Sequence, residues 1–172
     1  IGMEQHSGSN QWRWQVVLIF LGILCVGFFL RSFHFSDWLH FELDQARDAR
    51  VIDSAAEGSF FDLPLLGPKA GGTFLRLGPF FYVFQYVSGL VFGTDPVGYA
   101  LGVMLLSTAT IGVFFLLARR FFSHQLSLGL TALLSVSAYF VMYGRFAWNP
   151  NPLPFFILAG FYALLRSVDM RE

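Results

Sequence analysis

The sequence predicts an all-α, multi-pass membrane protein with about four transmembrane helices and two juxtamembrane helices in its first external loop. Composition is the first reason: 55% of the residues are hydrophobic and only 13% are charged, whereas a soluble domain carries about 25% charged residues. The second reason is that several apolar runs reach about 20 residues, the length that a helix needs to cross about 30 Å of hydrocarbon. The formal net charge of zero lacks the basic excess that is typical of nucleic-acid binding. We therefore expect membrane lipids, and no nucleic acid, as partners.

The first expected span covers residues 14–33, "WQVVLIFLGILCVGFFLRSF". A cleaved signal peptide is the alternative, because Arg13 precedes a short apolar core. We favour a span, since the run ends in Arg31, His34 and bulky aromatic residues and not in a small-residue cleavage site.

Two helices are expected in the external loop at residues 34–96. Residues 44–57, "DQARDARVIDSAAE", form a helix that ends before Gly58. Residues 79–92, "PFFYVFQYVSGLVF", would make a helix of about 21 Å, which is too short to cross the membrane comfortably. We expect this second helix to lie at the membrane surface or to dip into one leaflet.

Three further spans are expected at residues 97–118, 125–144 and 153–168. If 79–92 does not cross, the basic residues near the span ends all fall on one side, which the positive-inside rule assigns to the cytoplasm. These residues are Arg13, Arg119, Arg120, Arg166 and Arg171. The charged stretch after the first span and the turn "YGRFAWNPNP" then share the opposite, extracytoplasmic face.

The helix at 44–57 carries the first candidate chemistry. At 100° per residue, Asp44, Arg47 and Asp48 share a sector about 100° wide. Periodicity alone favours a solvated helix with ion pairs between successive turns. The functional alternative is that Asp44 serves as a base or metal ligand, with Arg47 paired to it or to a phosphate.

Two later segments add polar candidates on the same face. The loop "GPKAGG" would let backbone amides and Lys69 approach an anion; a plain connector is the default, and Lys69 and Arg76 would equally serve as lipid-headgroup anchors. The turn "RFAWNPNPLP" stops a helix at two Asn-Pro steps. It presents Asn149 and Asn151 at the membrane boundary, one turn after Arg145.

Taken in order, these segments resemble the GT-C superfamily of membrane glycosyltransferases, in particular family-39-like members related to protein O-mannosyltransferases and lipid A aminoarabinose transferases. The resemblance runs from about residue 14 to the end, and its most specific parts are "DQARDA" and "RFAWNPN". It implies a sugar donor carried on a polyprenyl phosphate and transfer at the extracytoplasmic face of the plasma (inner) membrane. Because family members are commonly longer, it also implies the N-terminal part of a longer protein.

The resemblance assigns roles to individual residues. Asp44 aligns with the catalytic or metal-binding acidic position, and a divalent metal ion is the one cofactor implied. The implied substrate-binding residues, of which the basic ones in the first loop contact the phosphate, are Arg47, Asp48, Lys69, Arg76, Arg145, Asn149 and Asn151. Many relatives have two adjacent acidic residues where this chain has Asp44-Gln45, and some have an aspartate near the turn where this chain has asparagines. Both departures leave metal dependence open.

A non-enzymatic membrane protein, either a transporter or flippase fragment or an accessory subunit, is the competing class. A transporter is expected to place ionisable residues within its spans, near the midplane. Here the expected spans are almost free of charge and the polar groups gather at one boundary. This pattern favours surface chemistry on a lipid-borne substrate.

Overall fold

The computed structural model describes residues 4–71 and 73–170, with side-chain surroundings from residue 12 onward; Gly72 and Arg171 lie outside the described residues. Within this part the chain is helical throughout, apart from one isolated backbone bridge between Lys69 and Arg76. The prediction of an all-α fold is therefore confirmed for the described residues.

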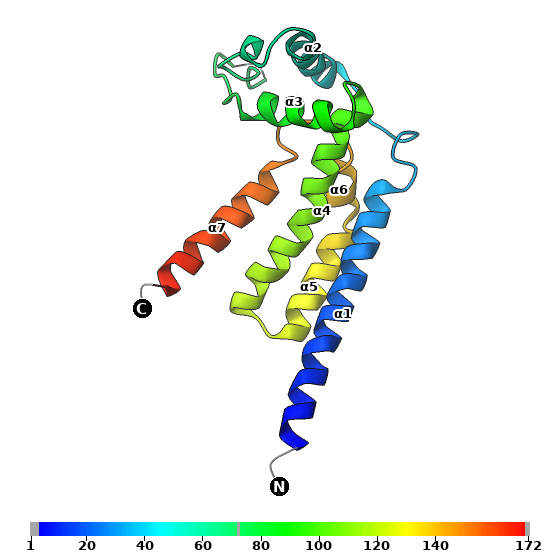
Figure 1. Ribbon diagram of the computed structural model, residues 1–172, viewed down its shortest axis with the longest axis vertical. Coiled ribbons are helices and arrows are strands. Elements are labelled where there is room, and N and C mark those ends of the chain that lie inside the picture. The colour runs from blue at the N-terminus through cyan, green and yellow to red at the C-terminus, as the bar shows by residue number, and fades with distance from the viewer. Residues whose placement is uncertain (1–3, 72, 171–172) are drawn as a thin grey trace.

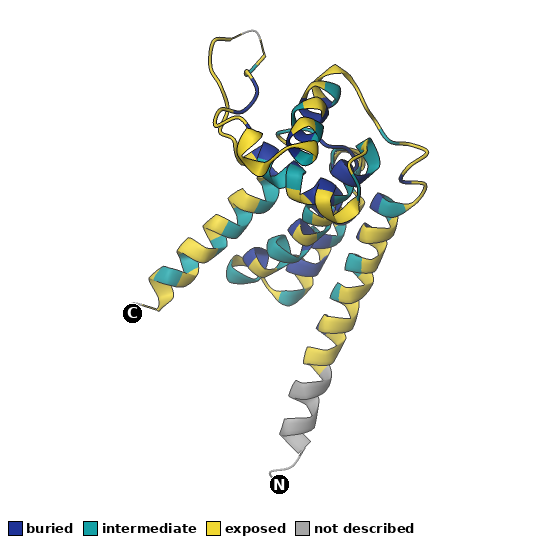
Figure 2. Cartoon of the chain, turned by 45° about the horizontal axis from the view of Figure 1, so that its top comes forward, coloured by how far each residue is buried: buried dark blue, intermediate teal, exposed yellow. Residues whose placement is uncertain are grey.

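The long helices form a bundle. Helices α1 (Glu4–Ser32), α4 (Pro96–Phe121) and α5 (His124–Val136) pack against one another, and α7 (Leu153–Asp169) packs against α4 (Figure 1). Two segments, Trp12–Ser32 and Pro96–Phe121, are long and apolar enough to cross a membrane. Much of the surface of α1 and α7 is exposed (Figure 2), and its exposed residues include many large apolar side chains. Contiguous apolar surface of this kind is typical of a membrane-embedded face.

The expected single span at 125–144 is wrong in one respect, because it is broken at Ser137 into α5 and the short α6 (Ala138–Tyr143). In a continuous helix the Ser135 carbonyl would accept from the amide four residues later. Instead it accepts from Nη1 of the buried Arg31 at 3.0 Å, while Arg31 Nε donates to Ser107 Oγ at 2.9 Å. A long-range hydrogen bond thus satisfies the carbonyl that the break would otherwise leave open.

A head of shorter helices sits on one end of the bundle. It contains α2 (Leu43–Glu57), the 3₁₀ turn η1 (Phe60–Asp62) and α3 (Phe80–Phe92), and α3 lies across the end of α4 (Figure 1). Helix α2 begins with a capping box, in which the Glu42 amide donates to Gln45 Oε1 at 2.8 Å. The orientation of α3 is the one expected for a surface helix rather than for a fifth span.

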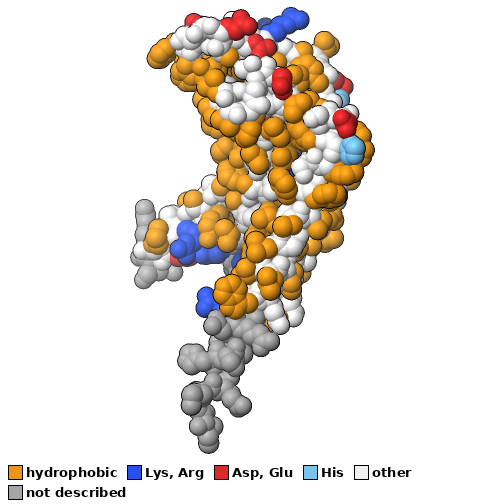
Figure 3. Space-filling view, turned by 45° about the vertical axis from the view of Figure 1, so that its right-hand side comes forward, with side chains coloured by type: hydrophobic (Ala, Val, Ile, Leu, Met, Phe, Trp, Pro, Cys, Tyr) orange, Lys and Arg blue, Asp and Glu red, His pale blue; other side chains and the backbone are white. Residues whose placement is uncertain are grey.

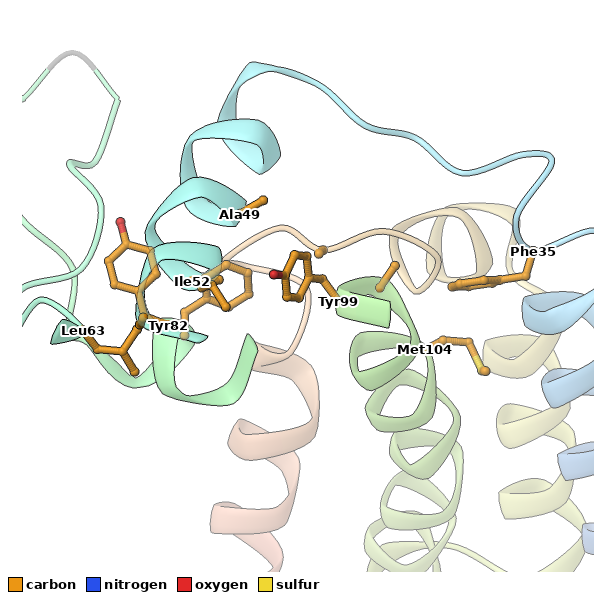
Figure 4. Close-up of a cluster of buried hydrophobic side chains, with 11 residues drawn as sticks. Phe35, Ala49, Ile52, Leu63, Tyr82, Tyr99 and Met104 are labelled. Carbon is orange, nitrogen blue, oxygen red and sulfur yellow. The ribbon is translucent and has the colours of Figure 1, made fainter. Parts of the chain in front are cut away.

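Apolar and aromatic side chains attach the head to the bundle. Ala49 and Ile52 of α2 are buried against Tyr82 of α3 and Tyr99 of α4 (Figure 4). The two tyrosine hydroxyls donate to carboxylates of α2, Tyr82 to Asp48 at 3.4 Å and Tyr99 to Asp53. These contacts fix the position of α2, and with it the acidic residues at its start.

Small residues let α3 lie directly on α4. The Gly102 amide donates to Ser88 Oγ at 3.1 Å, and Ser88 Oγ donates to the Gly98 carbonyl at 2.7 Å. A Cβ at Gly102 would lie 2.5 Å from Ser88 Oγ and 2.9 Å from its Cβ. This close approach is typical of small-residue packing between apolar helices.

Candidate active site

A polar pocket of about 430 Å³ lies where the start of α2 faces the turn after α6. One side carries His40, Glu42, Leu43, Asp44 and Gln45, and the other carries Tyr143, Phe146 and Trp148. The fold therefore brings Asp44 together with the turn about a hundred residues later. The expectation that these two segments meet holds for Asp44 and the aromatic residues of the turn.

An apolar pocket of about 730 Å³ adjoins the polar one. It lies between the end of α1 and α6, and its lining residues are Phe29, Leu30, Phe33, Trp38, His40, Ala138, Val141, Met142, Tyr143, Arg145 and Phe146. His40, Tyr143 and Phe146 line both pockets. An amphipathic molecule can therefore place an apolar chain in one pocket and a polar group in the other.

Arg47 holds Asp44 through a pair of ion contacts. Its Nη1 lies 2.8 Å from Asp44 Oδ1, and its Nε lies 2.9 Å from Asp48 Oδ1. The Asp44 side chain is about half exposed, at 55%, whereas that of Asp48 is buried, at 4%. Burial raises the pKa of the Asp48 carboxyl, although Arg47 partly counteracts this, and the hydrogen bond to Asp48 raises the pKa of Arg47. A buried carboxylate thus anchors the guanidinium that orients Asp44.

The other basic residues predicted for the site lie elsewhere. Lys69 and Arg76 pair through their backbones in the loop at 67–77, between η1 and α3, and neither lines the polar or the apolar pocket. Arg145 lines the apolar pocket, but its guanidinium donates to the carbonyls of Leu30, Arg31 and His34, each at 3.0 Å. It therefore caps the C-terminal end of α1, where orphan carbonyls favour a cation.

The two predicted asparagines shape the turn and do not line the polar pocket. Asn151 Nδ2 donates to the Phe146 carbonyl at 2.9 Å, which closes the turn. Asn149 lines a separate pocket beside Phe80 at the start of α3. The residues of this turn that do line the polar pocket are Phe146 and Trp148.

The pocket residues that were not predicted from the sequence include His40, Glu42 and Tyr143. His40 Nε2 lies 3.3 Å from Glu42 Oε1. The signal for the first two was their position beside Asp44 in the charged stretch "HFELDQARDAR". Tyr143 had no signal, because aromatic residues are frequent throughout this chain.

A metal site built by protein alone needs several ligating side chains close together. Among the described residues, no group of three or more His, Cys, Asp or Glu side chains is placed to hold a metal ion. Asp44 and Glu42 line the same pocket, but two carboxylates are fewer ligands than a site built by protein alone usually supplies.

These features define a class of protein: a helical membrane protein with a pocket at one end of its apolar bundle, in which an arginine orients a carboxylate. A family model described as dolichyl-phosphate-mannose-protein mannosyltransferase matches residues 44–172, which is most of the chain, and the chain belongs to this family. The family is one of glycosyltransferases, so the expected relationship to protein O-mannosyltransferases is confirmed, and an enzyme is favoured over a non-enzymatic membrane protein. Neither the curated proteins nor the solved structures gave a match.

Proposed function

We propose that the protein transfers a sugar from a polyprenyl-phosphate-linked donor to a lipid, glycan or protein acceptor, with Asp44 as general base. The observation that carries this proposal is the junction between the apolar pocket and the polar pocket that holds Asp44. The donor has the same order of parts: an apolar chain, a phosphate and a sugar. The family's printed name, with its dolichyl-phosphate-linked mannose, supports a donor of this class.

In this reaction Asp44 takes part in one step, a proton transfer. The carboxylate accepts the proton of an acceptor hydroxyl, whose oxygen attacks the anomeric carbon of the sugar. The bond between that carbon and the phosphate oxygen breaks, and polyprenyl phosphate leaves with the bonding electrons. Arg47 orients the Asp44 carboxylate, because its Nη1 lies 2.8 Å from Asp44 Oδ1. General-base catalysis of this kind contributes about 10²- to 10⁴-fold to a rate.

The wall opposite Asp44 suits a sugar ring. The ring centroid of Phe146 lies 5.6 Å from that of Tyr143 and 6.3 Å from that of Trp148. Three neighbouring rings give a broad apolar surface with polar edges, on which the C–H face of a sugar can lie.

The charge distribution supports an extracytoplasmic site in the plasma (inner) membrane. Arg119 and Arg120 lie in the last turn of α4, and Arg166 lies in the last turn of α7, at the ends far from the head. Figure 3 shows basic side chains around these lower ends, whereas the upper part carries acidic and histidine side chains together with a basic group at its top. By the positive-inside rule the lower ends face the cytoplasm and the pocket faces outward.

The test is Asp44→Asn in the full-length protein, assayed in membranes with a radiolabelled polyprenyl-phosphate sugar. We expect transfer to fall by about 10²- to 10⁴-fold, with normal amounts of protein in the membrane. Asp37→Asn is the matched control, because Asp37 is exposed and pairs with His34 outside both pockets. Undiminished transfer by the Asp44 variant would refute its role as the base.

A further inference from the structure

We infer that His40 binds the phosphate of the lipid-linked donor and carries it through the reaction; this rests on the proposed function. His40 lines both the apolar and the polar pocket. A donor whose chain fills the apolar pocket and whose sugar reaches Asp44 must place its phosphate at the boundary between them. His40 stands at that boundary together with Tyr143 and Phe146.

The polar pocket is acidic without a bound cation. Glu42 and Asp44 both line it, and their charges repel a phosphate in a partly desolvated site. Of the residues that line this pocket, His40 is the one side chain that can become a cation. A phosphate therefore needs His40 more than it would in a neutral pocket.

The other cations of the described head are engaged or distant. Arg47 is held between Asp44 and Asp48. Arg145 lines the apolar pocket, but its guanidinium donates three hydrogen bonds to carbonyls at the end of α1. Arg50, Lys69 and Arg76 line neither pocket. This leaves the phosphate to His40.

The imidazole is oriented for this task. Its Nε2 lies 3.3 Å from Glu42 Oε1, and its ring stands edge-on to Phe146 with 5.0 Å between the centroids. Among the described residues, none is hydrogen-bonded to Nδ1. An imidazolium donates from both nitrogens, so Nε2 can hold Glu42 while Nδ1 donates to a phosphate oxygen. As the sugar leaves, the phosphate gains a negative charge, and this charge-assisted hydrogen bond strengthens.

The experiment measures binding of two lipids that differ only in the phosphate: a polyprenyl monophosphate and the polyprenol of the same length. The full-length protein in nanodiscs is compared with His40→Gln and His40→Arg, and with His124→Gln as control, because His124 begins α5 at the opposite end of the bundle. We expect His40→Gln to weaken binding of the phosphate lipid about tenfold and to leave polyprenol binding unchanged. His40→Arg, which keeps a cation, should retain the preference for the phosphate lipid.

Two other binding results would overturn the inference. If His40→Gln binds both lipids as the wild type does, the phosphate lies elsewhere. If His40→Gln loses binding of both lipids equally, His40 shapes the apolar pocket and does not bind the phosphate. Sugar transfer is measured on the same samples: a wild type that shows the His40-dependent preference but transfers no sugar would overturn the proposed function alone.

Discussion

Arg47 connects a carboxylate that water cannot reach to one that faces the pocket. Asp48 is buried and hydrogen-bonded to Tyr82 at 3.4 Å, so it cannot move without disturbing the contact between α2 and α3. Its bond to Arg47 Nε therefore fixes the guanidinium plane, and Nη1 of that plane holds Asp44. Because a planar guanidinium presents its donors in a rigid fork, it can satisfy two carboxylates at set angles.

Arg47→Lys tests this arrangement at the level of one residue. Lysine keeps the charge, but its single ammonium group cannot hold Asp44 and Asp48 in the same geometry. We expect kcat for sugar transfer to fall about 10- to 100-fold, because a misplaced base loses much of its effect, with a smaller change in KM for the donor.

Arg50→Lys provides the comparison for that variant. Arg50 lies on the same helix and is exposed, so its replacement should leave both kinetic constants near the wild-type values. An equal loss in the two variants would mean that replacing any arginine of α2 impairs the reaction, and that the fork geometry of Arg47 has no special part in it.

At the level of the helices, the head is held on the bundle by backbone contact as well as by side chains. The Asp95 side chain caps α4 by accepting from the Gly98 amide at 2.7 Å. A Cβ at Gly98 would collide with the carbonyl of Gly93, which itself has a φ of 115° that favours glycine. The atoms that the new Cβ would meet belong to the backbone of Gly93, so they cannot turn aside as a flexible side chain would.

Gly98→Ala is therefore expected to loosen the junction of α3 with α4. Overpacking of this kind costs about 1–3 kcal/mol, so the unfolding temperature of the full-length protein in detergent should fall by several degrees. Gly112→Ala on the same helix is the control, because its Cβ would meet only Phe20 Cζ at 3.9 Å, an ordinary contact. Alanine should raise helix stability there by up to about 1 kcal/mol. If both variants unfold alike, the close approach at Gly98 is not what limits the junction.

Helix positions were predictable from sequence where local pattern decides them, and not where a distant contact does. Apolar runs and caps predicted α2, α3 and α4 to within a few residues, and they predicted the C-terminal end of α1. No glycine or proline marks the break at Ser137 in the sequence. The break is accompanied by a hydrogen bond from Arg31 to the Ser135 carbonyl, 104 residues away along the chain. No local pattern carries that information.

The site shows the same division. The contact between Asp44 and Arg47 was predictable because it depends on spacing within one helix, and the structure shows it. Lys69, Arg76 and the two asparagines were chosen by residue type in loops, whose direction depends on the whole fold, and they lie away from the polar pocket. His40 lies in the charged stretch beside Asp44, but only the meeting of α1, α2 and α6 places it between two pockets.

On the scale of the whole molecule, the position of α3 decides the topology. If α3 lies along the membrane surface, the loop at 67–77 and the α3–α4 junction are both extracytoplasmic, and the α4–α5 connection is cytoplasmic. If α3 crosses instead, the loop stays outside, the junction becomes cytoplasmic and the α4–α5 connection moves outside. The arrangement of α3 across the end of α4 (Figure 1) and the basic pair Arg119 and Arg120 in the last turn of α4 both favour the first topology.

Single-cysteine labelling separates these topologies, because Cys25 is the chain's one cysteine and can first be replaced by serine. Phe74→Cys, Thr94→Cys and Phe122→Cys then report on the loop, the junction and the α4–α5 connection, and all three positions are exposed. We expect a membrane-impermeant thiol reagent to label the first two variants in intact cells, and the third only after permeabilisation. Labelling at Phe122 but not at Thr94 in intact cells would instead mean that α3 crosses the membrane. The turn after α6 would then lie in the cytoplasm, on the opposite side from the start of α2, so the two walls of the polar pocket could not meet. The basic end of α4 would also face outward, against the positive-inside rule.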